Sequence, residues 1–326
     1  MFKADHIHGS RLSRTGLAIM VLLLCFCPDT EARDKKTVFV IKSRVIRPYE
    51  EAYSGFRKEL SARAFALTYL EHDLQKFSDD LGALIKEVDR SEANIVLVIG
   101  TEAAVFARRS IKTRPVVFTM LLNPVENGIV DSFQRPGGNI TGVSLNISLQ
   151  KQFSMLKKIV PRIDKVGMLY DVVNRRGFAD EAIRAAEKSG LKLISKPVYD
   201  ESEISPKLDE VLAEADCLWA EVDPMIYNSS TARNIILSTL RADLPFMAFS
   251  ENFVRAGALM ALKCDYHDIG RQSAEIAVDI LENQKTHNIP VKRPRKTHLV
   301  INVRTAEIIG VDIPAEHLEE AVVYGR

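Results

Sequence analysis

The chain has 326 residues, of which 46% are hydrophobic and 27% charged, a composition typical of a globular protein. Its 44 Lys and Arg side chains balance 43 Asp and Glu side chains, so the formal net charge is only +1. A chain this close to neutral lacks the general attraction to nucleic acid or anionic lipid that a strongly basic protein has. Binding must therefore depend on local sites, and the length favours two lobes.

The amino terminus, 1–32, has the pattern of a secretion signal. A basic segment precedes an apolar run at 17–26, which is too short to span a bilayer comfortably. We expect cleavage after Ala32 and a mature chain that is periplasmic or otherwise exported. Two alternatives stay open: a lipid anchor on Cys25 or Cys27, which lack the usual small residues before them, and a short apolar helix that remains attached.

From residue 37 onward, short apolar strands alternate with amphipathic segments of helical length. The strands at 94–101 and 115–122 are apolar at nearly every position, which predicts a parallel sheet covered on both faces. In this half the predicted strands are 37–42, 65–70, 94–101, 115–122 and 140–145, and the predicted helices are 49–60, 79–88 and 102–110.

The stretch 115–148 contains the strongest turn signals in the chain. Pro124 ends the strand before it, and a short helix is expected to follow. Gly137 and Gly138 then allow the positive φ angles of a tight turn before the strand at 140–145.

The second half repeats the same alternation, which predicts two doubly wound Rossmann-like α/β lobes joined near 144–149. The predicted helices are 149–159, 177–189, 204–215, 229–240, 268–283 and 305–309, with a short helical turn through Arg255. The predicted strands are 165–170, 191–198, 217–223, 244–250, 257–263 and 298–303. The basic run 292–296 has no interleaved aromatic residues, which favours a solvated loop over a nucleic-acid patch.

Catalytic signatures are largely missing. Ser154 and Lys157 have Ser-x-x-Lys spacing but none of the partner motifs, and no nucleophile elbow or phosphate-binding loop is found. The histidines form no metal-ligand pair, so we expect no metal site, no cofactor and no enzyme. Cys217 and Cys264 are expected to be buried thiols, although a disulfide between them stays open.

Polar groups follow the predicted strands in both halves, at the edge where an open α/β sheet usually binds its ligand. Helices start just after several of them, so free backbone N–H groups would favour an anion such as a carboxylate. The candidate ligand-binding residues are Ser43, Gly100, Thr101, Asn123, Thr141, Tyr170, Asp171, Asn174, Asp223, Ser250 and Glu251. Trp219 and Tyr227 could stack on an aromatic ligand, although the apolar strand around Trp219 favours a core position. The carboxylates of Glu221 and Asp223 are expected to contact ligand or cap a turn.

Three stretches carry a resemblance to a known family: PVVFTMLLNPVENGIVDSFQRPGGNITGVS at 115–144, LPFMAFSENFVRAGALMALKCDYHDIGRQSAEIAVDIL at 244–281, and LVINVRTAEIIGVDIP at 299–314. They resemble the ABC-transporter substrate-binding proteins that include tryptophan- and tyrosine-binding members. The similarity extends over about 95–314. Where the family usually has Asp-Pro-Val, this chain has Asn123, which removes an anionic partner for a ligand ammonium. Asp171 or Asp223 could replace that charge, or the ligand is not an amino acid.

The resemblance implies a periplasmic-binding-protein type I fold, with two lobes that are joined by three crossings and close on a small ligand. It implies that 268–283 returns to the first lobe and 299–302 to the second. The expected organisation is a signal at 1–32, a first lobe from 33–145 with about 266–285, and a second lobe from 146–265 with about 286–326.

These observations predict an exported, non-enzymatic solute-binding protein of an ABC importer. It is expected to be a monomer that captures a small solute, such as an aromatic amino acid or a related compound, and delivers it to a membrane permease. Nucleic acid is not an expected partner. A sensing module for a signalling receptor and an exported enzyme on the same scaffold stay open as alternatives, and neighbouring permease or kinase genes would separate import from sensing.

Overall fold

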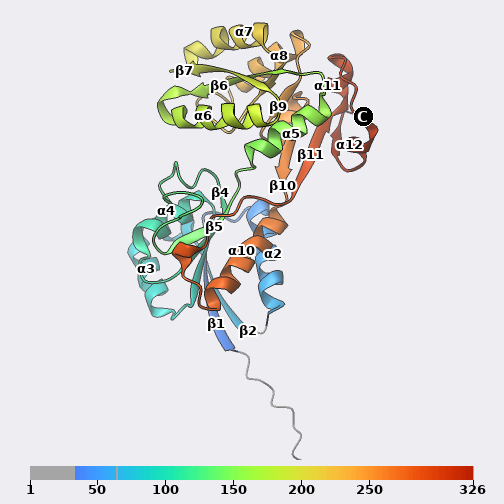
Figure 1. The fold of residues 1–326 in the computed structure, drawn as a ribbon. Coiled ribbons are helices and arrows are strands. Elements are labelled where there is room, and N and C mark those ends of the chain that lie inside the picture. The colour runs from blue at the N-terminus through green and yellow to red at the C-terminus, as the bar shows by residue number, and fades with distance from the viewer. Residues whose placement is uncertain (1–33, 64, 326) are drawn as a thin grey trace, which may run out of the picture.

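The computed structural model describes residues 34–63 and 65–325, apart from the side chains of Asn174 and Arg176. Figure 1 shows two α/β lobes, one above the other, connected by a narrow waist. The first lobe is built on a five-stranded sheet and the second on a seven-stranded sheet. The predicted two-lobed α/β fold class is confirmed, whereas the predicted signal at 1–32 lies outside the described residues.

The five-stranded sheet has the order β2-β1-β3-β4-β5, and all its pairs are parallel, as the apolar strands predicted. Its strands are β1 (Asp34–Lys42), β2 (Phe65–Asp73), β3 (Ile95–Ile99), β4 (Val116–Leu121) and β5 (Ile140–Ser144). Helices α2 (Arg47–Ser61) and α10 (Tyr266–Leu281) cover one face, and α3 (Leu81–Arg90) and α4 (Thr101–Ser110) cover the other, with η1 (Leu74–Phe77) following β2.

Helices α2 and α10 meet backbone to backbone, although they lie more than two hundred residues apart in the sequence. A Cβ atom added at Gly270 would lie 1.8 Å from the Ala52 carbonyl oxygen. One added at Gly55 would lie 2.0 Å from the His267 carbonyl oxygen. Glycine at both positions is therefore a condition for α10 to pack on the first lobe.

The seven-stranded sheet has the order β12-β11-β10-β9-β8-β6-β7, and its one antiparallel pair is β10 with β11. Its strands are β6 (Lys165–Asp171), β7 (Lys192–Val198), β8 (Cys217–Trp219), β9 (Phe246–Ala248), β10 (Met260–Cys264), β11 (Thr297–Asn302) and β12 (Val322–Tyr324). Helices α5 (Leu149–Ile159), α6 (Val172–Lys188) and α11 (Val303–Ile308) pack on one face, and α7 (Ile204–Glu214) and α8 (Ala232–Arg241) on the other. Shorter elements are η2 (Glu201–Glu203), α9 (Glu251–Ala256), η3 (Thr286–Asn288) and α12 (Ala315–Glu319).

The structure differs from the sequence-based elements in four main places, one of which is β8, which ends at Trp219 although its strand was predicted to reach residue 223. The short helix expected after Pro124 is a turn, in which the amide of Asn127 donates to the carbonyl of Asn123 and Gly128 has φ +63°. Helix α6 begins at Val172 rather than at Gly177, and it is kinked where Arg175 has φ −131° and ψ 24°. Both α12 and β12 follow the last predicted helix, where the sequence gave no periodic signal.

Three crossings connect the lobes, at 145–148, at 265 and at 289–296, and they touch one another. The Sγ of Cys264 lies 3.6 Å from the Leu145 carbonyl oxygen, joining the first and second crossings. The amide of Asp265 donates to the Lys296 carbonyl at 3.3 Å, joining the second and third. The third crossing begins as an extension of the first sheet, because the Ser144 amide donates to the Lys292 carbonyl at 2.9 Å.

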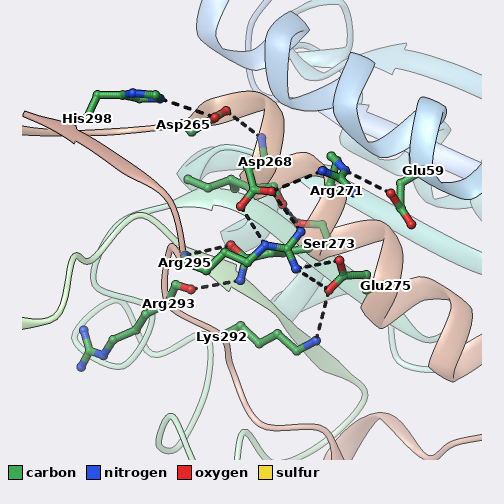
Figure 2. A network of polar contacts seen from close by, with 12 residues as sticks. Glu59, Asp265, Asp268, Arg271, Ser273, Glu275, Lys292, Arg293, Arg295 and His298 are labelled. Carbon is green, nitrogen blue, oxygen red and sulfur yellow. Dashed lines mark hydrogen bonds and ion pairs between the residues drawn. The ribbon is translucent and has the colours of Figure 1, made fainter. Parts of the chain in front are cut away.

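The third crossing is held to α10 by ion pairs, as Figure 2 shows. The Nε and Nη2 atoms of Arg295 donate to the two carboxylate oxygens of Asp268 at 2.9 and 3.0 Å, and Nη1 donates to Glu275 at 2.8 Å. Arg271, on the same helix, bonds Glu59 of α2 at 3.0 Å. The basic run is thus a loop whose basic side chains are at least partly exposed, as predicted, and it is anchored to α10 because Arg295 pairs with two of that helix's carboxylates.

Candidate functional site

Two asparagines connect the end of β4 to the first crossing. Asn123 follows β4 with φ +50°, and its amide donates to the Oδ1 of Asn146 at 2.8 Å. The Nδ2 of Asn146 donates back to the Oδ1 of Asn123 at 2.5 Å. Asn tolerates this left-handed conformation better than most side chains, since its short amide can bond locally. The pair fixes the point at which the first lobe enters the waist.

Glu221 follows β8 and faces the waist from the second lobe. The indole Nε1 of Trp219 donates to the Oε1 of Gln152 at 2.9 Å, which aims the Gln152 amide nitrogen at the Glu221 carboxylate. Burial raises the pKa of Glu221, while the Gln152 hydrogen bond and the nearby Arg175 act to lower it. Trp219 itself is fully buried against Phe153, so it belongs to the core, as its apolar strand predicted.

Arg175 projects from the kink of α6 and is only 7% exposed. Its Nη1 donates to the carbonyl of Val222 at 2.8 Å, and its Cζ lies 4.0 Å from the centre of the Phe178 ring. Across the waist, Nη2 lies 3.9 Å from the carboxylate of Glu126, in the turn that follows β4. Burial raises the pKa of Glu126, and Glu181 raises it further, while Arg175 lowers it.

Arg293 comes from the third crossing and contacts the same region of the waist. Its guanidinium stacks 4.1 Å from the centre of the Phe133 ring, and its Nη1 donates to the Asn146 carbonyl at 3.4 Å. Its Nη2 is 3.8 Å from the Glu181 carboxylate, too far for a hydrogen bond. Burial lowers the pKa of Arg293, while Glu181 and Glu221 act to raise it.

Two cavities open at the waist, on either side of the first crossing, and both are lined from the two lobes. The Arg175 cavity, of about 340 Å³, is lined by Asn123, Glu126, Phe133, Arg175, Phe178, Glu181 and Arg293 among others. The Tyr266 cavity, of about 480 Å³, is lined by Pro48, Phe249, Ser250, Glu251 and Tyr266 among others. Asn146, Ile147 and Glu221 line both. These volumes are in the range of small-molecule sites, roughly 300–1,000 Å³.

The charges in the Arg175 cavity are three glutamates and two arginines on a partly aromatic wall. Such a lining can bind a solute that carries both a positive and a negative group on an apolar body. Among the described residues no cluster of His, Cys, Asp or Glu could hold a metal ion. In the same part of the chain, no helix is long and apolar enough to cross a membrane.

A family model for ABC transporter substrate binding proteins matches residues 49–323, which is most of the chain. The chain belongs to this family. The resemblance found in the sequence is thereby confirmed, and the waist of this ABC transporter substrate binding protein is the place to look for its substrate.

Three proteins are similar to this substrate binding protein, one in sequence and two in fold. A tyrosine-binding protein of Clostridioides difficile is 24% identical over 288 residues, covering 86% of this chain and 83% of its relative. A ligand-free, open substrate binding protein with adhesive properties from Clostridium difficile is 21% identical, with a TM-score of 0.74 over 88% of this chain and 98% of the other. An ABC domain from Streptococcus pneumonia in complex with L-Trp is 23% identical, with a TM-score of 0.60 over 89% of this chain and all of the other.

The binding protein's structure brings three of the eleven candidate residues to the described lining of the two cavities, and Glu221, which was expected to contact ligand or cap a turn, lines both. Asn123 lines the Arg175 cavity, whereas Ser250 and Glu251 line the Tyr266 cavity. The Glu251 carboxylate already bonds Lys263 at 2.8 Å and also accepts from the Tyr324 hydroxyl, and these bonds lower its pKa to about 2.

Other predicted residues serve helix starts and turns. The Ser43 hydroxyl accepts from the Ala103 amide at 2.9 Å, at the start of α4, where Gly100 has φ +95° and Thr101 is the first helical residue. The Asp171 carboxylate accepts from the Val173 amide at 2.8 Å. The Asp223 carboxylate accepts from the Asp171 amide at 3.1 Å and from the Met225 amide at 3.2 Å.

The last predicted positions lie away from the cavity linings described above. The Thr141 hydroxyl donates to the Ile289 carbonyl at 2.8 Å, which fastens the third crossing to β5. Tyr170 packs against the core of the second lobe, and Tyr227 is buried with its ring 5.7 Å from that of Phe249. The side chain of Asn174 is outside the described residues. Cys217 and Cys264 are buried free thiols, as expected.

Sequence reasoning missed the residues that give the Arg175 cavity its charge. Glu126, Arg175, Glu181 and Arg293 come from a turn, a helix and a crossing, and none of them ends a strand. One local signal was available. Two adjacent arginines, 175 and 176, come directly before Gly177, the residue at which a helix was expected to begin.

Proposed function

We propose that this chain is the exported solute-binding component of an ABC importer, which captures a small solute at the waist and delivers it to a membrane permease. The observation that carries the proposal is the lining of the Arg175 cavity from both lobes, beside three crossings that touch one another. A rotation about these crossings would move Glu126 of the first lobe relative to Arg175 of the second. Such hinge closure around a ligand is the usual binding motion of two-lobed binding proteins.

The solute is proposed to be an aromatic amino acid or a related compound. Among the relatives, one is a tyrosine-binding protein and another was crystallised with L-Trp. The position of Asn123 lacks a negative charge, and Glu126, Glu181 and Glu221 of the cavity wall could take over the contact to a ligand ammonium. Burial raises the pKa of both Glu126 and Glu221, so a cationic group placed between them would relieve an unfavourable desolvation.

The proposal includes a monomer that works outside the cytoplasm without a cofactor and without catalysis. Export rests on the signal-like pattern of 1–32, and delivery to a permease rests on membership of the family.

A thermal-shift screen of residues 33–326 against amino acids, nucleosides, sugars and small peptides tests solute capture. A solute at one hundred times its Kd should stabilise the folded state by about 2.7 kcal/mol, and its melting temperature should rise accordingly. Small-angle scattering of the same complex should show a smaller radius of gyration as the lobes close. Uptake of the identified solute should then fall in cells that lack the gene. Stabilisation by no solute at millimolar concentration would contradict the proposal.

A further inference from the structure

The guanidinium of Arg175 is hydrogen-bonded at Nη1 and lacks a hydrogen-bond partner along its Nε–Nη2 edge. Its Nη1 atom donates to the Val222 carbonyl, and one face of the group lies on Phe178. On the opposite edge, Nε is fully buried and makes no hydrogen bond to any described residue. The other nitrogen of that edge, Nη2, has the Glu126 carboxylate at 3.9 Å, which exceeds hydrogen-bond distance.

An unpaired edge of this kind is unusual for a side chain that is only 8% exposed, because an unpaired buried donor costs about 1–3 kcal/mol. The kink of α6 at Arg175 brings the side chain to the waist. The carbonyl and the ring then fix the guanidinium in one orientation. The guanidinium is therefore held in one orientation at the wall of the Arg175 cavity before any solute arrives.

Two parallel N–H groups on one side of a guanidinium match the two oxygens of a carboxylate. We infer that the solute carries a carboxylate, which binds side-on to the Nε and Nη2 atoms of Arg175. This inference rests on the proposed function and deepens it, because it assigns one chemical group of the solute to one side chain. The two remaining walls then have separate roles, with Phe133 and Phe178 facing the apolar body and Glu126 and Glu181 facing any ammonium.

Glu126 is the competing partner for this edge. If closure of the lobes brought its carboxylate onto Nε and Nη2, Arg175 would form an ion pair between the lobes and would not contact the solute. The two cases differ in one respect: with an interlobe ion pair, the affinity would not depend on whether the solute has a carboxylate.

Matched pairs of solutes separate these cases in the wild-type protein. Isothermal titration calorimetry at pH 7 would compare L-tyrosine, L-tryptophan, L-leucine and 3-phenylpropionate with their primary amides, which lack the carboxylate charge. We expect at least one acid to bind, and its amide to bind on the order of thirtyfold more weakly, since one partner of a buried charge pair is lost. In Arg175→Gln, the acid should bind about as weakly as its amide binds to the wild type. Little difference in affinity should then remain between acid and amide. Arg184→Gln, an exposed arginine on the same helix, is the matched control and should behave as the wild type.

Equal binding of acid and amide by the wild type would overturn the inference, as would an acid preference that survives in Arg175→Gln. Binding of a nucleoside or a sugar, with none of the acids bound, would also overturn it while leaving the proposed function intact. Binding of no member of the wider panel would refute the proposed function and this inference together. Melting of the ligand-free variants shows whether Arg175→Gln is folded, and the wild-type comparison decides the matter even if it is not.

Discussion

Replacing Arg295 with Met should lower the free energy of unfolding by more than the loss of an exposed ion pair does. The Asp268 side chain is only 3% exposed and receives two hydrogen bonds from Arg295, at 2.9 and 3.0 Å. Its other cationic neighbour, Arg271, lies 3.8 Å away. Removing one partner of a fully buried pair costs roughly 3–5 kcal/mol, but Arg295 is 40% exposed, so we expect about 2–3 kcal/mol.

Urea unfolding of Arg295→Met measures this loss as a lower midpoint with an unchanged slope. Arg47→Met is the matched control, because Arg47 is 90% exposed and pairs with Glu51 at 2.8 Å along the same helix. That variant should lose less than about 0.5 kcal/mol. Adding Asp268→Asn to Arg295→Met should recover part of the loss, since the double variant no longer buries an unpaired charge. Equal losses of stability for Arg295→Met and Arg47→Met would refute the reasoning. So would a double variant whose loss equals the sum of the losses for Arg295→Met and Asp268→Asn measured singly.

Two further predictions concern stability. Gly270→Ala should lower the free energy of unfolding by about 2 kcal/mol or more, because its Cβ would lie 1.8 Å from the Ala52 carbonyl oxygen. Gly177→Ala is the control and should not be destabilising, because nothing lies within 4 Å of its Cβ position. Chemical denaturation measures both variants, and a Gly270→Ala as stable as the wild type would contradict the close helix contact. Glu251 has its pKa lowered to about 2 by Lys263 and Tyr324, so its contribution is present above the unfolded value of about 4.5 and is lost as the pH falls toward 2. The stability difference between wild type and Glu251→Gln should therefore shrink over that window, and a difference that stays constant from pH 6 to pH 3 would show that the shift is absent.

Most of the fold could be predicted from periodicity. The strands of the first sheet are buried on both faces, and that property is visible as uninterrupted apolar runs such as 95–99. The kink of α6 could not be predicted, because the Val222 carbonyl that Arg175 reaches at the kink lies forty-seven residues further along the chain and leaves no local sequence signal. The turn after Pro124 was mistaken for a helix, since the Asn127 amide bonds the Asn123 carbonyl four residues back, as in one helical turn that the chain then does not continue.

The candidate site was less predictable than the fold. The rule that ligands bind at strand ends found Asn123, Ser250 and Glu251, which line the cavities. It also selected Ser43 and Asp223, whose side chains accept hydrogen bonds from backbone amides. Capping and ligand contact use the same residue types at the same places, so sequence alone does not separate them. The charged wall is assembled by the crossings, and its members lie too far apart in sequence to form a motif.

The close approach of α2 and α10, at Gly55 against His267 and at Gly270 against Ala52, has a consequence for the order in which the molecule is built. Helix α2 lies near the start of the described residues, and the helix that covers its apolar face lies within the last fifth of the sequence. During synthesis, the first lobe must therefore wait for nearly the whole chain before its sheet is covered on both faces. Such distant pairings slow folding. The first lobe therefore reaches its final packing only after most of the second lobe has been synthesised.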